Sequence, residues 1–199
     1  MPDRDRSPPP PQDDDDIRAM IEAGDARGAA TEALRRHGPR ALRYLRAVLH
    51  DEDLARDAFS HLAERVWKGL PSFEWRSSLR TWMLRLAWNA ALNVRDEAWR
   101  RRARRFETGE ASRLAEELRT KSFVRVERQR NALLELRASL SPEEQSLLAL
   151  RIDQNLSWDE VAAVLGAEGA PVDPATLTKR FERLKDRLGK LAREKGLID

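Results

Sequence analysis

The segment that follows Ser78 is apolar on two opposite faces, and this pattern limits the possible folds more than any other part of the sequence. At helical spacing, one face consists of Leu79, Met83, Leu86, Ala90 and Val94, and the opposite face of Leu84, Trp88 and Leu92. A helix that is apolar on two sides must be covered on both of them. The segment therefore predicts a long helix at the centre of a helical bundle, with Ser78 as its N-cap.

Helical periodicity extends upstream of this segment, and no run of strand periodicity interrupts it. A first short helix is expected to begin near Ile17. Further helices are predicted over 26–36, 40–49 and 53–68, with a break at Gly38-Pro39 between the first two. The pattern as a whole predicts an all-α fold.

The C-terminal third contains three helix starts. Ser141 and Ser157 each open a Ser-x-x-Glu capping box, in which serine and glutamate bond the free N–H groups at a helix start. Asp173-Pro174 supplies a cap and a first-turn proline for a third helix, and Gly166 is expected to end the second. The third helix carries an apolar stripe flanked by a row of basic residues. This order predicts a helix-turn-helix whose last helix faces phosphate, with a solvated, salt-bridged face as the alternative.

Charge is distributed unevenly along the chain. Residues 2–16 contain six Asp, two Arg and a run of four Pro, a composition too polar to bury a core. Lys plus Arg exceed Asp plus Glu by only 37 to 34 overall, but residues 80–105 and 179–195 each contain eight basic residues. Two separated positive surfaces suit a long polyanion. The expected organisation is a disordered tail over 1–16, a helical domain over 17–105, a flexible linker over 106–130 and a helix-turn-helix domain over 131–199.

Composition excludes several classes of protein. No apolar run reaches the roughly 18 residues of a membrane span, so no membrane insertion is expected. The chain has no Cys, which excludes disulfides and thiolate metal sites. The N-terminus lacks the apolar segment of a secretory signal, so we expect a cytoplasmic protein.

Asp57, His61 and Glu64 share one expected helix at spacings that can build a metal or acid–base site of an enzyme. The sequence offers no second histidine near them, no glycine-rich phosphate loop and no Ser/His/Asp arrangement. We interpret them as exposed helix residues, and we expect no catalytic site, no metal and no cofactor.

Two blocks of sequence resemble the extracytoplasmic-function (ECF) branch of the bacterial sigma-70 family, over residues 17–197. Residues 55–67 and 78–90, the latter reading SLRTWMLRLAWNA, are similar to sigma region 2, whose usual pattern is Ser-Phe-Arg-x-Trp-Leu-x-Arg-Ile-Ala-x-Asn. Residues 140–151 and 156–166, the latter reading LSWDEVAAVLG, are similar to region 4. The resemblance implies two helical domains, and a transcription initiation factor that binds core RNA polymerase, places it on a promoter and melts the DNA.

The resemblance assigns polymerase docking to the helix over 55–67. The residues carried over are Asp57, Leu62, Glu64, Arg65 and Trp67. Ser60-His61 stands where the family usually has Gln-Glu, and Ala63 where it has Phe, so individual contacts differ from the family pattern.

The resemblance assigns the minus-ten element to the loop over 70–77 and the helix after it. The residues carried over are Phe73, Trp75, Arg76, Arg80, Trp82, Arg85, Asn89, Asn93 and Arg95. Aromatic and guanidinium planes suit this task because stacking contributes about 1–3 kcal/mol per base on single strands. The alternative is structural: Phe73 and Trp75 anchor the loop, and Trp82 lies in the core. A cluster of point charges carries no base code, so Arg100, Arg101, Arg102, Arg104 and Arg105 are expected to contact phosphate.

The resemblance assigns the minus-thirty-five element to the last helix. The expected contacts are Thr176, Thr178, Lys179, Arg180, Arg183, Lys185 and Arg187, of which Lys179 or Arg183 suits a guanine edge. The turn over 167–173 is longer than the tight link of the family, so the register of these contacts in the groove stays open.

Two other functions are compatible with a helical chain of this kind: an ordinary two-domain helix-turn-helix regulator, and a helical protein-interaction module that does not bind polymerase. An aromatic loop beside an Arg-rich helix suits a melted strand and argues against both. Family members are commonly held inactive by an anti-sigma factor between the two domains, which makes one an expected partner. Folding of Asp13–Asp16 over Arg100–Arg105 in competition with DNA is a further hypothesis, and a solvated tail is its alternative.

Overall fold

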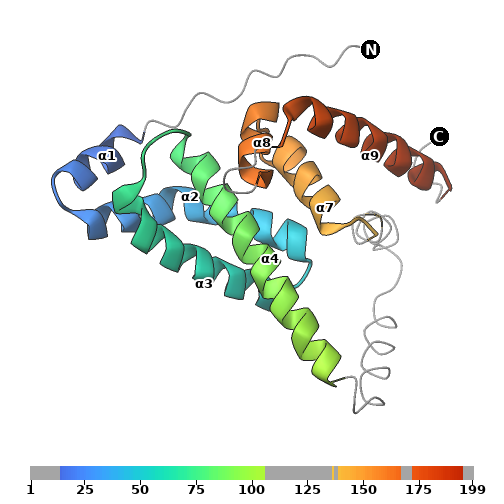
Figure 1. The fold of residues 1–199 in the computed structure, drawn as a ribbon, viewed down its shortest axis with the longest axis horizontal. Coiled ribbons are helices and arrows are strands. Elements are labelled where there is room, and N and C mark those ends of the chain that lie inside the picture. The colour runs from blue at the N-terminus through green and yellow to red at the C-terminus, as the bar shows by residue number, and fades with distance from the viewer. Residues whose placement is uncertain (1–13, 106–135, 137–138, 167–171, 195–199) are drawn as a thin grey trace, which may run out of the picture.

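The structure is a computed structural model that describes residues 14–105, 136, 139–166 and 172–194, with the backbone alone at residues 99 and 101–105. Every regular element in these ranges is helical, which confirms the predicted all-α class (Figure 1). Most of the expected tail and all of the expected linker over 106–130 lie outside the described residues. No described helix is both long enough and apolar enough to cross a membrane.

Five elements form the N-terminal bundle. They are α1 (Asp15–Glu22), α2 (Ala26–Leu49), α3 (Glu52–Gly69), the 3-10 turn η1 (Leu70–Ser72) and α4 (Leu79–Arg105). Helices α2, α3 and α4 pack against one another, and α1 packs on α2. Short polar side chains set the helix starts: Asp25 accepts from the Gly28 N–H at 2.8 Å, and Ser78 from the Thr81 N–H at 3.1 Å. The prediction of Ser78 as an N-cap is confirmed.

Helix α2 runs without interruption through Gly38 and Pro39, so the predicted break at this point was wrong. Packing explains the difference. A Cβ atom at residue 38 would lie 3.3 Å from Cζ of Phe59, so glycine lets α2 approach α3 closely. Pro39 is exposed, and the bundle holds the helix together despite the backbone hydrogen bond that proline cannot donate.

Helix α1 begins at Asp15, so the last residues of the expected tail belong to the fold. Asp14 is buried and lies 2.9 Å from Nε2 of the buried His37. Asp16 accepts from both terminal nitrogens of Arg36, at 2.8 and 2.5 Å. These acidic side chains bind α2, and the idea that Asp13–Asp16 folds over the arginines at the end of α4 is wrong for Asp14 and Asp16.

Both apolar faces of α4 are buried, as predicted for a central helix. Leu79, Met83 and Val94 are at most 2% exposed on one face, and Leu84 and Trp88 are 1% and 5% exposed on the other. The helices that cover α4 come from two parts of the chain, because α2 and α3 lie on it together with α8 from the C-terminal part.

The C-terminal domain consists of α7 (Pro142–Leu148), the π-helical turn η3 (Ala149–Asp153), α8 (Trp158–Leu165) and α9 (Pro174–Glu194). Both predicted capping boxes are confirmed. The Ser141 N–H donates to Glu144 at 2.8 Å, and the Ser157 N–H donates to Glu160 at 2.9 Å. Helix α8 ends at Gly166, whose φ of −68° is extended rather than left-handed. Trp158 of α8 meets Phe181 of α9 edge to face at 5.4 Å, which joins the two helices.

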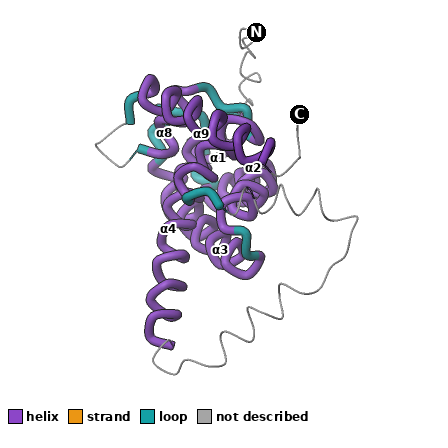
Figure 2. The backbone as a smooth tube through the Cα atoms, turned by 90° about the vertical axis from the view of Figure 1, so that its right-hand side faces the viewer, coloured by secondary structure: helices purple, strands orange, loops and turns teal. Residues whose placement is uncertain are grey.

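The C-terminal domain lies directly on the N-terminal bundle, where α7 meets α2 and α8 meets α4. Figure 1 shows α7, α8 and α9 grouped on one side of α4, where α8 makes the contact with α4, and Figure 2 shows the last turns of α4 extending beyond the bundle. The described residues thus form two helical units in contact.

Candidate nucleic-acid interface

Helix α3 presents an outer face that the sequence assigned to a protein partner. Its buried side, formed by Ala55, Ala58, Leu62 and Val66, packs in the bundle. Leu62 is 0% exposed, so its expected role as a docking contact was wrong: it supports the helix from within. The other four expected docking residues, Asp57, Glu64, Arg65 and Trp67, are exposed, and Trp67 is one of the two large exposed hydrophobic side chains in the described chain.

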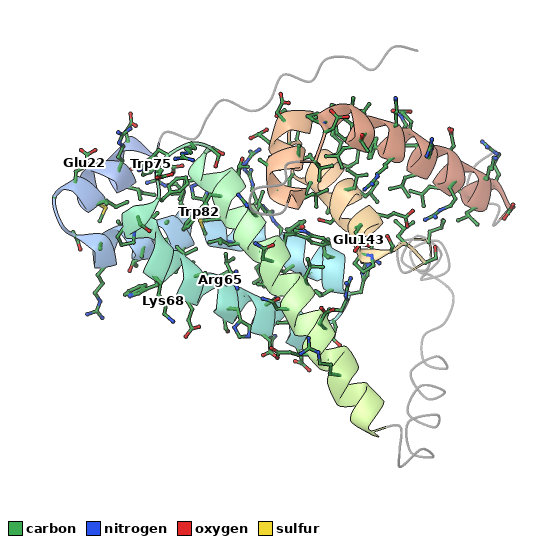
Figure 3. All side chains as sticks on the ribbon, in the orientation of Figure 1. Glu22, Arg65, Lys68, Trp75, Trp82 and Glu143 are labelled. Atoms are coloured by element: carbon green, nitrogen blue, oxygen red, sulfur yellow. The ribbon has the colours of Figure 1, made fainter. Side chains whose placement is uncertain are left out.

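Three aromatic rings form a cluster at the loop before α4. Phe73 stacks on Trp82 with centroids 4.8 Å apart, and Phe73 meets Trp75 at 5.0 Å. Trp82 also covers Gly69, where a Cβ atom would lie 3.2 Å from Cζ2 of the indole. All three rings are half-buried, so they anchor the loop while part of each ring stays open to solvent. Figure 3 shows Trp75 and Trp82 together at this end of the bundle, apart from Arg65 and Lys68 on α3.

Trp75 adopts a left-handed backbone conformation with φ of 56°. This region is unusual for a bulky residue. The guanidinium of Arg18 from α1 lies 5.9 Å from the centroid of the Trp75 ring, within cation–π range. The neighbouring Arg76 is exposed and pairs with Glu74 at 2.9 Å.

Arg80 lies at the start of α4 but is only 8% exposed, which contradicts its expected place on an open DNA surface. Its Nη2 atom lies 3.7 Å from Oε1 of Glu160 on α8. Thr81, 2% exposed, donates to the same oxygen at 3.2 Å. Burial lowers the pKa of the Arg80 guanidinium, Glu160 partly restores it, and Arg40 lowers it further.

The remaining expected minus-ten residues are accessible to different degrees along α4. Asn93 is exposed, and Arg85, Asn89 and Arg95 are half-buried. Arg100 is exposed at the protruding end of the helix, whereas the side chains of Arg101, Arg102, Arg104 and Arg105 lie outside the described residues. Of the expected minus-ten and phosphate residues on α4 whose side chains are described, Asn93 and Arg100 are thus the exposed ones.

Helix α9 sorts its charges as expected. Thr176, Lys179, Arg180, Arg183 and Arg187 are exposed along one flank, whereas Thr178 and Lys185 lie on the other at about 100° per residue. Buried Leu177, Phe181 and Leu184 form the inner stripe. Hydrogen bonds from Thr176 and from the first backbone N–H groups hold the pKa of Asp173 below its usual range, which keeps the cap ionised at the helix start.

Ion pairs divide the basic residues of α9 into two groups. Arg187 binds Glu144 of α7 at 2.7 Å, and Lys185 binds Glu182 at 3.0 Å. Within the described part of the chain, Lys179, Arg180 and Arg183 form no ion pair, so three charges on the same flank are available to an anionic partner.

Sequence reasoning missed the residues that join the two domains. The hydroxyl groups of Tyr44 on α2 and Ser146 on α7 form a hydrogen bond, and both residues are completely buried. Trp88 of α4 lines a cavity of about 620 Å³ together with Leu147, Leu165 and Leu184. In the sequence, only the second apolar face of α4 indicated that another helix packs there. The spacing of that face does not identify the helix that covers it.

No group of three His, Asp or Glu side chains in the described ranges is placed to hold a metal ion. The two features that stand out are an aromatic loop beside a basic helix and a capped helix-turn-helix with a basic flank. Together they are the kinds of surface that a two-domain, all-α nucleic-acid-binding protein presents. Residues 33–106 match the family description of sigma-70 region 2. Over these residues the chain is similar to the sigma-70 family, in agreement with the resemblance seen in the sequence.

Comparison with known proteins extends over both domains. The chain is 28% identical over 170 residues to RNA polymerase sigma factor YlaC of Bacillus subtilis (strain 168), covering 80% of this chain and 92% of the relative. The fold is similar to that of the sigma factor RpoE from Bartonella quintana, solved in complex with the anti-sigma factor NepR. The TM-score is 0.55 at 18% identity, covering 82% of this chain and 96% of that one.

Proposed function

We propose that this chain directs RNA polymerase to promoters through three separate surfaces: the outer face of α3 for the polymerase, the aromatic loop with α4 for the minus-ten element, and the basic flank of α9 for the minus-thirty-five element. The observation that carries the proposal is the presence of two positive surfaces on one small chain, one beside stacked aromatic rings and one on a helix-turn-helix. Promoter duplex and melted strand require these two kinds of surface. The expected place of action is the cytoplasm.

Polymerase docking is proposed for the exposed side of α3. Trp67 supplies apolar area, and Asp57, Glu64 and Arg65 supply charges around it. An exposed aromatic residue with polar neighbours is a common centre of a protein interface. Leu62 is left out of this surface because it is buried.

Capture of a minus-ten base is proposed for Phe73, Trp75 and Trp82. Their half-buried rings combine firm anchorage with an open edge, which suits stacking of an unpaired base. Arg76 of the loop and Arg85 of α4 supply positive charge, and Arg100 is placed to follow the DNA backbone toward the end of α4.

Minus-thirty-five recognition is proposed for α9. The flank with Lys179, Arg180 and Arg183 is exposed and free of ion pairs within the described residues, whereas Lys185 lies on the other side and is paired. We assign the groove contacts to the first group, together with Thr176. Thr178 is left out of the groove contacts, because its hydroxyl donates to the Pro174 carbonyl of the same helix at 3.0 Å.

An anti-sigma partner is proposed as well. The cavity between α4, α7 and α9 has an apolar floor and a rim of Arg180, Arg183 and Arg187, so a protein segment seated there would cover the flank that reads DNA. The similar sigma factor from Bartonella quintana was solved with such a partner.

The experiment that tests the proposal is run-off transcription with purified core polymerase on selected promoter fragments. We expect Lys179→Ala with Arg183→Ala to reduce promoter affinity by about tenfold to a hundredfold and to lower the salt slope by about two, since two phosphate or base contacts are removed. Lys185→Ala is the matched control on the opposite flank and should change affinity less than about twofold. The absence of any transcript with wild-type protein would reject the function, and equal effects of both variants would reject the assigned flank.

A further inference from the structure

Helix α1 brings an arginine to the aromatic loop. The guanidinium of Arg18 lies 5.9 Å from the centroid of the Trp75 ring, which is within cation–π range. Figure 3 shows Trp75 at the same end of the bundle as Glu22, the last residue of α1. Arg18 belongs to none of the three surfaces proposed above, yet it faces a ring that is proposed to hold a minus-ten base.

Ion pairs and hydrogen bonds to α2 fix the position of α1. The buried carboxylate of Asp14 lies 2.9 Å from Nε2 of His37, and Asp16 accepts from both terminal nitrogens of Arg36. The side chain of Arg18, two residues further along the helix, is 54% exposed. Arg18 therefore projects from an anchored helix and remains open to a partner.

The Arg18 guanidinium is bound at one edge. Its Nε atom donates to Oε1 of Glu22 at 3.1 Å. Within the described part of the chain, its two terminal nitrogens have no hydrogen-bond acceptor. The fork of terminal N–H groups on an arginine matches two oxygens of a phosphate. The free edge of this guanidinium therefore suits a phosphate group.

The other arginines near the loop lack this combination. Arg80 is 8% exposed and faces Glu160. Arg76 is exposed and pairs with Glu74 at 2.9 Å, and among the described residues it lies over no aromatic ring. Arg18 thus combines contact with a ring of the loop and an open donor edge.

The geometry points to a backbone contact beside the captured base. Each internal nucleotide of a strand has a phosphate on both sides of its sugar, so a base held at Trp75 brings phosphates near the groups around that ring. We propose, on the basis of the function proposed above, that Arg18 binds the phosphate that adjoins the captured minus-ten base. The single-strand surface then extends from the loop onto α1, and this contact positions the strand without reading a base.

The test measures the affinity of the holoenzyme, reconstituted from the full chain and core polymerase, for fluorescein-labelled forked DNA. The fork is derived from promoter fragments selected with the wild-type holoenzyme and has an unpaired minus-ten strand. Arg18→Gln should lower the affinity by about threefold to tenfold and the salt slope by about 0.7, because one single-strand phosphate contact is lost. Arg18→Lys keeps the charge and should stay within about threefold of the wild type.

Arg27→Gln is the matched control. Arg27 is an exposed arginine of α2 with no ion pair in the described residues, so the substitution removes the same charge away from the loop. It should change the affinity less than about twofold and leave the salt slope unchanged. Equal affinities for Arg18→Gln and Arg27→Gln would overturn the proposal. Circular dichroism and urea unfolding check that both variants keep the fold.

A scan of single methylphosphonates, each of which neutralises one phosphate of the unpaired strand, locates the contact. At one position next to the captured base, the neutral group should weaken binding by the wild type about threefold to tenfold. Binding by Arg18→Gln should not change at that position, because the contact is already lost, whereas Arg27→Gln should respond as the wild type does. The same loss at every position for Arg18→Gln and the wild type would reject the contact.

Trp75→Gly separates this contact from base capture, since it removes the ring while glycine accepts the left-handed backbone. Loss of fork binding with Trp75→Gly but not with Arg18→Gln would reject the phosphate contact alone. Wild-type affinity of Trp75→Gly would reject base capture at this loop, and the Arg18 contact with it. Run-off transcription by the wild-type holoenzyme is scored separately, so a failure of promoter direction is distinguishable from both.

Discussion

Individual side chains in this protein often serve a neighbouring element as well as their own. Arg36 is the clearest case, because its guanidinium binds Asp14, Asp16 and Glu32 and so ties the entry into α1 to the middle of α2. The hydrogen bond with Arg36 lowers the pKa of Asp16 from its ordinary 3.8 to about 2. A carboxylate with a lower pKa in the folded state stabilises the fold above its unfolded pKa, and this stabilisation is lost as the pH falls.

This linkage gives a prediction about acid unfolding. Stability contributed by the Arg36–Asp16 pair should be complete above pH 3.8 and should decline as the pH falls toward about 2. Arg36→Gln removes the pair, so the free energy of unfolding should fall less steeply with pH in that window. Arg27→Gln, an exposed arginine with no ion pair in the described residues, is the control. Urea unfolding at several pH values measures both, and identical pH slopes for Arg36→Gln and the wild type would contradict the assignment.

At the scale of a helix, α2 shows how packing overrides a local signal. Pro39 donates no hydrogen bond to the carbonyl four residues earlier, and its ring crowds that carbonyl, yet the helix continues to Leu49. Close contact of Gly38 with Phe59, and the 24 residues of helix packed on α3 and α4, offset this local cost.

Replacement of the proline should therefore stabilise the protein. We expect Pro39→Ala to raise the free energy of unfolding by about 1–2 kcal/mol, since about 3 kcal/mol of helix penalty is removed and the unfolded chain regains some freedom. Pro71→Ala is the control, because Pro71 stands in the first turn of η1, where proline fits. Chemical denaturation distinguishes the two, and an equal loss of stability in both variants would show that the proline is not a cost in α2.

The sequence predicted helix caps, which are local features, better than contacts between helices, which are long-range. Ser78, Ser141 and Ser157 were predicted as caps because each acts on backbone groups within three residues. The path of α2 through Pro39 was not predicted, since it depends on contacts with other helices. Glu160 was recognised as a capping residue, but its partner Thr81 is 79 positions away, and no periodicity reports such a pair.

The residues of the candidate site also divide into those predicted from local sequence patterns and those whose environment depends on distant parts of the chain. The sorted flank of α9 followed from helical spacing, because a face is a local property of a helix. Trp67 was assigned to a surface by resemblance, and it is exposed. Leu62 and Arg80 were assigned by resemblance to surfaces and proved to be buried. A single sequence could not reveal the burial of Arg80, because the element that covers it belongs to the other domain.

For the whole molecule, the two binding faces differ in accessibility. The outer face of α3 is exposed, and α3 packs against α2 and α4 rather than forming a main contact with the C-terminal helices (Figure 1). The proposed minus-ten face is partly covered by α8.

Independence of these faces is testable by combining substitutions. Trp67→Ala should weaken binding to core polymerase by about tenfold, the loss typical of an exposed aromatic anchor. The same factor is expected with Glu160→Gln already present, because distant sites without shared partners act additively. Arg56→Ala, an exposed residue of α3 outside the proposed surface, is the control. A factor that changes when Glu160 is replaced would show that the α3 face and the contact between α4 and α8 are coupled.

The left-handed backbone at Trp75 has a consequence for how a base would be captured. A bulky residue at φ of 56° persists only where its surroundings impose that conformation, here the stacking of Phe73 on Trp82 and the guanidinium of Arg18. The loop is therefore ordered when the protein folds, and little conformational entropy remains to be lost when DNA arrives. The loop would then bind an unpaired base in a preorganised conformation, without an induced rearrangement, and would discriminate between bases by shape.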